Sequence, residues 1–426
     1  MIMKHILFFF VGMIAGSALL AQPVTSYFNG DVADVETAVQ SGAVLMGGAT
    51  ESDEAMKWFL QRAGGGDIVV IRSSGSDGYN DYFFSELEVS VNSVETLIIV
   101  SDEAANDPYV EQQIRNAEAL WIAGGDQWNY VNYWKDSPVE DALMYLISEK
   151  GVTVGGTSAG MAILGQAYFS AENGSITTSS ALSNPFAITM TVGYDDFLHV
   201  PFLEDVITDT HYDSPDRRGR HVAFMARMWA SYDVMPRAIA SEEYTAVCID
   251  ENGIGRVFGG FPNEQDFAYF IQANCEEPWE PETCLPSQPL SWDRDNQALK
   301  VYKVPGTVEG LYSFDLSNWH TGFGGEWLDW WVIAGQFSAG PSVGIPDCMT
   351  SGVSPLVAIE GQVNCFPNPT SNDQLSFTEP ISGDLIDASG RIIMRVNHSQ
   401  KADVSKVEPG LYQWNTNKGI IRWLKL

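Results

Sequence analysis

Short apolar runs alternate with helical stretches over residues 40–260 of the chain. The apolar runs are continuous, which is typical of strands buried on both faces of a parallel sheet. The predicted strands are residues 43–46, 67–71, 96–100, 119–123 and 152–154, and the predicted helices are residues 53–63, 108–117 and 138–149. This order predicts an α/β fold in which a three-layer parallel sheet has helices on both faces. Several strands end in small residues, so a ligand-binding crevice is expected at their carboxyl ends.

The pattern changes after residue 261. Residues 262–337 are rich in Trp, Pro and Gly, and we expect an irregular, β-rich extension packed against the core at residues 40–260. Core and extension together give one large domain at residues 40–335. Residues 338–362 are dense in Gly, Pro and Ser and predict a linker. Residues 363–426 hold short strands separated by turn residues, which predicts a small, separate all-β sandwich.

A targeting segment is predicted at residues 1–21. Lys4 and His5 precede an unbroken apolar run at residues 6–20, which is followed by Ala21 and Gln22. A short basic start, an apolar stretch of about 15 residues and a small residue at the exit are the features of a signal peptide. The run is shorter than the roughly 20 residues that a membrane-spanning helix needs. We therefore expect an exported, soluble protein whose mature chain begins near Gln22.

The charge of the chain argues against some classes of partner. The 426 residues include 23 Lys and Arg against 55 Asp and Glu, which gives a net charge of −32. Such an acidic chain is not expected to bind nucleic acid or an anionic membrane surface. Hydrophobic residues make up 45% of the chain and charged residues 18%, proportions that favour a folded globular protein.

The five cysteines are compatible with export, where disulfides can form. Cys275 and Cys284 flank a Pro- and Glu-rich loop and could be joined, and Cys348 and Cys365 could form a second disulfide. Cys248 lies in an apolar run and is predicted to be a buried thiol. There is no Cys-x-x-Cys or His-x-x-x-His pattern, so no metal site is predicted.

A candidate nucleophile follows the last predicted core strand. The motif Gly156-Thr-Ser-Ala-Gly160 stands between that strand and the apolar run at residues 161–164. Strand, sharp turn and helix are what a nucleophile elbow requires, with Ser158 exposed above the sheet edge. The backbone N–H of Ala159 would then be ready to donate to an oxyanion. The alternative is a glycine-rich turn whose serine is structural.

A serine nucleophile needs a base, most often histidine. The chain has six: His5, His199, His211, His221, His320 and His398. His199 is interpreted as a core or strand-edge residue and His221 as a packing residue of a helix. His211 follows a strand-like run at residues 205–207 and remains by elimination. For the carboxylate that orients the imidazole, the residues alone leave four candidates open: Glu242, Glu243, Asp209 and Asp250.

Several motifs together resemble the cyanophycinase branch of the peptidase E-like serine peptidases. They are Gly124-Gly-Asp-Gln127, Gly156-Thr-Ser-Ala-Gly160, Asp209-x-His211, Arg217-x-Gly-Arg220 and Glu242-Glu-Tyr-Thr-Ala246. The resemblance implies Ser158 as nucleophile, His211 as general base and Glu243 as the orienting carboxylate. It implies a fold similar to class I glutamine amidotransferases for the catalytic domain. The expected oxyanion hole combines the N–H groups of Ala159 and Gly125, and no metal or organic cofactor is expected.

The same resemblance indicates the substrate-binding residues. They are expected to be Asp126, Gln127, Asp209, Arg217 and Arg220. Arginine can hold a carboxylate through two parallel hydrogen bonds, which suits an Asp-rich or C-terminal carboxylate substrate. The alternative is that both arginines pair with acidic residues of the chain itself. Thr210 and Pro215 depart from the family pattern, where glutamine and arginine stand, and this leaves the substrate open.

The C-terminal unit has a resemblance of its own. Its marks are Phe366-Pro-Asn-Pro-Thr370, the segment 385–393, Glu408-Pro-Gly-Leu-Tyr412 and the segment 421–426. In this order they resemble the sorting domain of the type IX secretion system, which carries proteins across the outer membrane of Bacteroidota. The alternative is an ordinary β-sandwich accessory domain. The resemblance implies the type IX secretion machinery as a partner and a secreted or cell-surface location.

The sequence thus predicts an exported serine-type exopeptidase. It would cleave peptide or isopeptide bonds next to aspartyl residues of an acidic peptide or polymer, as in the release of β-Asp-Arg dipeptides from cyanophycin. One alternative is an aspartyl dipeptidase of the peptidase E type. Another is a catalytically inactive surface binding protein. The family often forms dimers, so a homodimer stays open.

Overall fold

The computed structural model describes residues 24–276, 278–344, 365–366, 374–387, 391–407, 410–416 and 419–425. The chain divides into two compact units, Met1–Cys348 and Met349–Leu426. The predicted signal peptide at residues 1–21 and most of the predicted linker lie outside the described residues, as do residues 367–370 and 408–409 of the sorting motifs. No helix of the described part is long and apolar enough to cross a membrane.

A ten-stranded mixed sheet forms the first half of the large unit. Its order is β1 (Thr25–Gly30), β4 (Ser93–Ile98), β3 (Asp67–Arg72), β5 (Ala119–Ile122), β6 (Thr153–Thr157), β2 (Gly42–Met46), β11 (Ala246–Ile249), β12 (Ile254–Phe261), β15 (Tyr312–Asp315) and β16 (Gly322–Phe323). The five strands from β4 to β2 are parallel, as predicted, and the strands at both ends are antiparallel.

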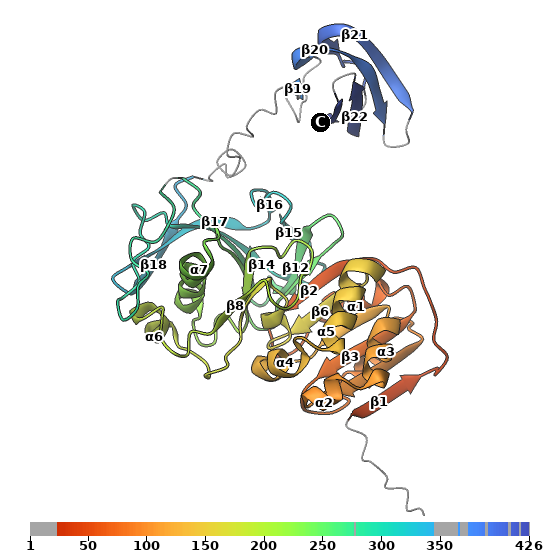
Figure 1. Ribbon diagram of the computed structural model, residues 1–426, viewed down its shortest axis with the longest axis vertical. Coiled ribbons are helices and arrows are strands. Elements are labelled where there is room, and N and C mark those ends of the chain that lie inside the picture. Colours follow the sequence, from red (N-terminus) through yellow and green to blue (C-terminus); the bar gives the residue numbers. More distant parts are fainter. Residues whose placement is uncertain are drawn as a thin grey trace, which may run out of the picture. The chain divides into compact units, whose positions relative to one another are not determined.

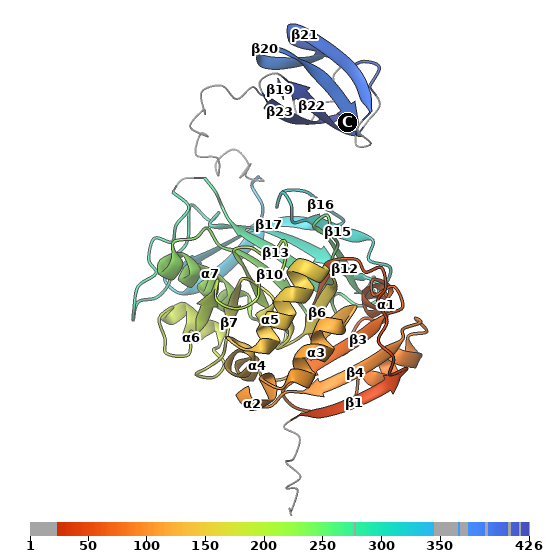
Figure 2. The same cartoon turned by 45° about the vertical axis from the view of Figure 1, so that its right-hand side comes forward.

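Helices cover both faces of the parallel part. The helices are α1 (Asp53–Gln61), α2 (Asp102–Ala105), α3 (Pro108–Asn116), α4 (Gln127–Trp134) and α5 (Pro138–Tyr145), which continues as a π-helical turn, Leu146–Lys150. Val44 and Met46 of β2 pack with Phe59 of α1, whereas Leu45 shares the opposite core with Ile114 of α3. Successive strand residues point to opposite faces, so the continuous apolar runs supply both cores. Helices α3 and α5 lie over β3 and β6 in both views (Figures 1 and 2).

A second sheet forms the other half of the unit. Its order is β18 (Gln336–Pro341), β17 (Glu326–Ile333), β14 (Leu299–Pro305), β13 (Phe267–Ala273), β10 (Arg237–Ser241), β9 (Val206–Asp209), β7 (Ala167–Phe169) and β8 (Val192–Tyr194). Ile239 and Phe270 on one face share a core with Val247 and Phe314 of the first sheet. The opposite face is covered by α6 (Thr178–Ser183) and α7 (Arg218–Tyr232).

Three differences from the sequence-based expectations concern the sheets. The segment 262–337 does not merely pack against the core, because β13, β14 and β17 extend the second sheet while β15 and β16 extend the first. Strands β9 and β10 belong to the second sheet, not to the predicted parallel sheet. Residues 338–341, placed in the predicted linker, pair with β17 as part of β18. Strand pairing over long sequence separations leaves no local periodic signal, which explains all three.

The cysteines also differ from one expectation. Cys284 is a buried free thiol whose Sγ lies 3.5 Å from the carbonyl oxygen of Ala226, while Cys275 is disulfide-bonded. A Cys275–Cys284 bridge therefore does not form. Cys248 is a buried free thiol, as predicted.

The C-terminal unit is all-β. Its strands are β19 (Cys365–Phe366), β20 (Gln374–Asp387), β21 (Ile392–Asp403), β22 (Gly410–Thr416) and β23 (Gly419–Lys425). All pairings among these strands are antiparallel and belong to one five-stranded sheet. Trp414, Leu385 and Phe377 lie at the centre of its small core. A β-sandwich was expected, whereas the described strands form a single sheet.

Candidate active site

The serine lies on a sharp turn at the end of a central parallel strand. Ser158 follows β6 directly and has φ of 52°, in the left-handed region that non-glycine residues rarely adopt. A Cβ atom on Gly160 would come within 2.1 Å of the Ile122 carbonyl oxygen, so the turn can pass β5 only with glycine there. A short 3₁₀ turn, Met161–Ile163, follows, where the sequence predicted the start of a helix. The strained serine is the geometry of a nucleophile elbow.

Two backbone N–H groups next to the serine are available to an oxyanion. Within the described residues, neither the N–H of Ala159 nor that of Gly125 has a hydrogen-bond acceptor. A Cβ atom on Gly124 would stand 3.6 Å from the Cβ of Ser158, so the Gly124-Gly125 turn reaches the nucleophile. Both residues predicted for the oxyanion hole therefore lie beside Ser158.

The imidazole of His211 contacts both expected partners. Its Nε2 lies 2.8 Å from Ser158 Oγ, and its Nδ1 lies 2.6 Å from Glu243 Oε1. With the proton on Nδ1, the neutral ring donates to the carboxylate and accepts from the serine hydroxyl. The side chains of His211 and Glu243 are about a quarter exposed. This linear arrangement is that of a Ser-His-Glu triad.

The other candidate carboxylates are occupied elsewhere. Glu242 accepts hydrogen bonds from the Phe267 N–H at 2.8 Å and the Tyr269 hydroxyl at 2.7 Å. Asp250 accepts from two backbone N–H groups of its own turn. Glu242 therefore faces Phe267 and Tyr269, whereas Glu243, in the turn that follows β10, faces His211.

The triad joins the two sheets. Ser158 stands at the end of β6 in the first sheet, whereas His211 and Glu243 follow β9 and β10 in the second. The turn after β2 connects them, because Gly47 O accepts from His211 N–H at 2.9 Å and Gly48 O accepts from Tyr244 N–H at 3.1 Å.

The two glycines of that turn were not among the predicted site residues. Gly48 has φ of 122°, and a Cβ atom there would stand 2.4 Å from His211 Nε2 and Cε1. The imidazole therefore rests directly on the backbone of Gly48. The sequence did contain a signal, because Gly47-Gly48 follows a predicted strand in the same way as Gly124-Gly125, the pair that was predicted to contribute to the oxyanion hole.

A cavity of about 450 Å³ opens at this place. Every predicted site residue except Glu243 lines it: Ser158, Ala159, His211, Gly125, Asp126, Gln127, Asp209, Arg217 and Arg220. Asp126 caps α4 by accepting from the Trp128 N–H at 3.0 Å. The sequence-predicted residues thus come together at one cavity. Within the described residues, no group of three His, Cys, Asp or Glu side chains is placed to hold a metal ion.

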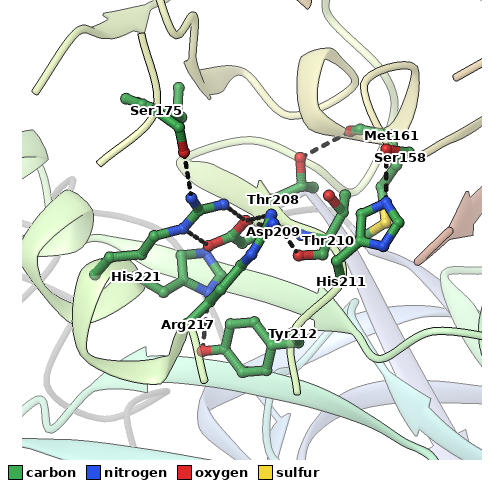
Figure 3. A network of polar contacts seen from close by, with 12 residues as sticks. Ser158, Met161, Ser175, Thr208, Asp209, Thr210, His211, Tyr212, Arg217 and His221 are labelled. Carbon is green, nitrogen blue, oxygen red and sulfur yellow. Dashed lines mark hydrogen bonds and ion pairs between the residues drawn. The ribbon is translucent and has the colours of Figure 1, made fainter. Parts of the chain in front are cut away.

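One of the two arginines is used inside the protein. Arg220 Nε and Nη2 donate to Asp209 Oδ2 and Oδ1 at 2.8 and 2.5 Å, and both side chains are buried. Burial alone would raise the pKa of Asp209, but the charge and hydrogen bonds of Arg220 outweigh it and lower this pKa below its usual value. The pair fixes Asp209 at the end of β9, two residues before His211 (Figure 3). Arg220 and Asp209 hold one another rather than extending unpaired into the cavity.

Arg217, the other arginine, has a hydrogen-bond donor that no described residue accepts from. Arg217 Nη1 donates to the Thr210 carbonyl oxygen at 3.1 Å and lies 3.9 Å from Asp209 Oδ1. Its Nε is buried without a hydrogen-bond partner in the described part of the chain. Burial and the neighbouring charge of Arg220 lower the pKa of Arg217. Arg217 thus lines the cavity with a guanidinium that is only partly hydrogen-bonded within the described residues.

Comparison with known proteins agrees with the motif resemblance. Residues 71–254 match the model of Peptidase family S51. A cyanophycinase from Nostoc sp. (strain PCC 7120 / SAG 25.82 / UTEX 2576) is 24% identical over 230 residues, which cover 52% of this chain and 72% of the relative. A cyanophycinase from Synechococcus elongatus is 24% identical over 227 residues, which cover 51% and 65%. These matches show that the chain is similar to peptidases of family S51.

Solved structures with similarity include two peptidases. One is a peptidase from an acI-B1 Actinobacterium, with 13% identity and a TM-score of 0.40, covering 55% of this chain and 91% of that one. The other is a putative peptidase E protein from Listeria monocytogenes EGD-e, with 15% identity and a TM-score of 0.33, covering 52% and 98%.

Proposed function

We propose that this protein is a serine-type exopeptidase that cleaves peptide or isopeptide bonds next to aspartyl residues, as a cyanophycinase does. One observation carries the proposal. The Ser158 hydroxyl, the His211 imidazole and the Glu243 carboxylate form a hydrogen-bonded line at the wall of a cavity. A fold of the class I glutamine amidotransferase type is part of the proposal, and the elbow at the end of a central parallel strand supports it.

The first half of the reaction transfers the acyl group to the enzyme. Ser158 Oγ attacks the amide carbonyl carbon while His211 Nε2 takes the hydroxyl proton, and Glu243 stabilises the imidazolium through Nδ1–H. The N–H groups of Ala159 and Gly125 donate to the oxyanion, and losing one such donor typically costs about 10²–10³ in rate. The tetrahedral intermediate collapses when His211 returns the proton to the leaving amine nitrogen, which breaks the C–N bond.

Water completes the cycle. His211 takes a proton from a water molecule, whose oxygen attacks the ester carbonyl carbon of the acyl-enzyme. The second tetrahedral intermediate releases the free carboxylic acid, and the proton returns to Ser158 Oγ. The same base, His211, therefore serves both halves of the reaction.

The substrate class follows from the charge at the cavity wall. Arg217 has an unused buried donor, and it suits a carboxylate of an aspartyl unit beside the scissile bond. Arg220 supports this site indirectly by fixing Asp209. Gln127 is a further polar contact for the substrate backbone, since its Nε2 makes only a long 3.5 Å hydrogen bond to the Phe169 carbonyl oxygen.

The first test measures release of Asp–Arg dipeptides from purified cyanophycin by the wild type and by Ser158→Ala. Activity in the wild type and its loss in the variant is the expected result. Ser85→Ala is a control, because Ser85 is exposed, does not line the cavity and donates its hydroxyl to the Asp81 carbonyl oxygen, so this variant should retain activity. Labelling with a serine-reactive fluorophosphonate is measured alongside.

The outcomes separate the alternatives. Labelling of Ser158 without turnover of the polymer would retain the hydrolase and discard cyanophycin as substrate. Turnover of Asp-X dipeptides alone would select an aspartyl dipeptidase of the peptidase E type. Absence of both labelling and turnover would favour the inactive surface binding protein.

We propose further that the chain is exported and sorted to the cell surface or medium. The signal-peptide pattern at residues 1–21 and the ordered motifs in residues 363–426 support this proposal. Deleting residues 363–426 should leave the protein inside the outer membrane of a host with a type IX secretion system. Unchanged export of the shortened chain would contradict the sorting role.

A further inference from the structure

A buried tyrosine–histidine pair lies next to the base. Tyr212 follows His211 directly, and its hydroxyl lies 3.1 Å from Nδ1 of His221 on α7. His221 Nε2 lies 3.2 Å from the carbonyl oxygen of Ile207. A carbonyl oxygen can only accept, so Nε2 has the proton and Nδ1 accepts from the tyrosine hydroxyl. Both side chains are buried, and Figure 3 shows the Tyr212 hydroxyl next to the His221 ring.

Burial determines the protonation state of this pair. It lowers the pKa of His221 to about 4, so the ring is neutral near pH 7. The sequence predicted His221 as a packing residue, and it is buried, but both of its ring nitrogens are hydrogen-bonded. A polar pair retained in a buried site specifies one geometry, because any other arrangement leaves a donor or acceptor unsatisfied.

The pair continues to the carboxylate side of the triad. The Tyr212 ring packs against Tyr269, with centroids 5.1 Å apart. The Tyr269 hydroxyl donates to Glu242 Oε1 at 2.7 Å, and Glu242 precedes Glu243. We call these four residues the Tyr212 cluster: His221, Tyr212, Tyr269 and Glu242. The cluster includes the residue that follows His211 and the residue that precedes Glu243.

The backbone at the triad needs such support. His211 itself has φ of 46°, and Tyr244, which follows Glu243, has φ of 62°. The backbone is therefore in the left-handed region at His211 and directly after Glu243. Non-glycine residues keep such conformations only where the surrounding structure enforces them. Arg217 N–H also donates to the Tyr212 carbonyl oxygen at 3.0 Å, which binds the same residue to the start of α7.

We propose that the Tyr212 cluster is a positioning device for the triad. The Tyr212–His221 hydrogen bond holds the backbone of His211 so that the imidazole stays between Ser158 and Glu243. The proposal rests on the catalytic role proposed for these three residues. Tyr212 and His221 act through His211 and do not contact the substrate, since neither lines the cavity.

The test uses the full-length protein and a fluorophosphonate, whose reaction with Ser158 requires His211 but no particular substrate. Tyr212→Phe removes the donor and retains the ring. We expect the inactivation rate constant at saturation to fall about 10-fold, since a displacement of about 1 Å can cost about 10²-fold. Reversible affinity for the reagent should not change, because the cavity wall is intact.

Two substitutions of His221 give a matched comparison. The amide of His221→Asn can place an oxygen near the Nδ1 position and accept from Tyr212, whereas the longer His221→Gln places its amide near the Nε2 position. His221→Asn should react within about twofold of the wild type, and His221→Gln should be about as slow as Tyr212→Phe. Equal rates for these two His221 variants would overturn the proposal.

A remote tyrosine controls for general loosening. Tyr302 lies on β14, which β13 separates from β10, and its hydroxyl accepts from the Gly325 N–H at 2.9 Å. Tyr302→Phe removes this hydrogen bond of a buried tyrosine. Its inactivation rate should equal that of the wild type. Equal slowing in Tyr302→Phe and Tyr212→Phe would overturn a positioning role.

A spectroscopic readout is independent of activity. The His211 Nδ1–H bonded to Glu243 should give a downfield proton resonance in protein labelled with ¹⁵N-histidine, and Tyr212→Phe should shift or broaden it. An unchanged resonance in Tyr212→Phe overturns the inference, as does its absence from the wild type. A wild type that shows the resonance but does not react with the fluorophosphonate would refute the proposed function and not the positioning role.

Discussion

The contact between Gly48 and His211, the proposed base, gives the sharpest prediction. Replacing Gly48 by alanine would place a Cβ atom 2.4 Å from His211 Nε2 and Cε1, where ordinary contacts begin at 3.4 Å. The imidazole must therefore move by about 1 Å, which is enough to break its 2.8 Å hydrogen bond to Ser158. A misplacement of about 1 Å can cost about 10²-fold in rate, so Gly48→Ala should react with a fluorophosphonate about 100-fold more slowly than the wild type.

Gly151→Ala is a control that separates the effect of a positive φ from the effect of the contact with His211. Gly48 has φ of 122°, and Gly151 also has a positive φ, 68°, but a Cβ atom on Gly151 would meet nothing within 4 Å. Gly151→Ala should cost about 1–2 kcal/mol of stability and leave the labelling rate unchanged. Inactivation kinetics and thermal melting of both variants are the measurements. A folded Gly48→Ala protein with the wild-type labelling rate would refute the contact between the imidazole and this turn.

Three remaining predictions concern the ion pair at the end of β9. Arg220→Met leaves Asp209 buried and unpaired, so unfolding should become easier by about 3–5 kcal/mol. Arg218→Met breaks an exposed pair with Asp216 and should cost less than about 1 kcal/mol in the same denaturant titration; equal losses would contradict the assignment of a buried pair. The lowered pKa of Asp209 means that its contribution is present above the unfolded-state pKa of about 3.9 and is lost as the pH falls through the lower folded-state value. In Arg220→Met the cation is gone and burial alone raises the pKa of Asp209, so the variant regains stability by protonation of this carboxyl as the pH falls from 7 to 4, while the wild type keeps its ion pair. The melting-temperature gap between wild type and Arg220→Met should therefore narrow over this range, and a constant gap would contradict this linkage.

The parallel part of the fold could be predicted from the sequence because its signal is local. Continuous apolar runs mark β2, β3, β5 and β6, and these strands are observed within a few residues of their predicted limits. The second sheet could not be predicted in the same way. Its parallel strands β9 and β10 and the antiparallel strands from β13 onward are joined by pairings between distant segments, which no local period records.

The residues of the candidate site also differ in whether a local sequence signal marks them. Ser158 stands in a local motif, and its position after a strand was readable from the sequence alone. The choice of Glu243 over Glu242 needed the family resemblance, because adjacent carboxylates differ only in the direction that they face. Gly48 was missed because its requirement comes from the ring of His211, a residue of another sheet.

The pairing of Arg220 narrows what the cavity can bind. Two arginines at the cavity suggested recognition of an acidic stretch, but Arg220 gives both ends of its guanidinium fork to Asp209. Among the described residues that line the cavity, Arg217 is then the cation whose donors are not all used. One available guanidinium matches one carboxylate, and the cavity volume of about 450 Å³ is that of a small-molecule site. For the proposed peptidase activity, this arrangement therefore favours a substrate with a single aspartyl unit at the cleaved bond over one that places several neighbouring carboxylates in the cavity.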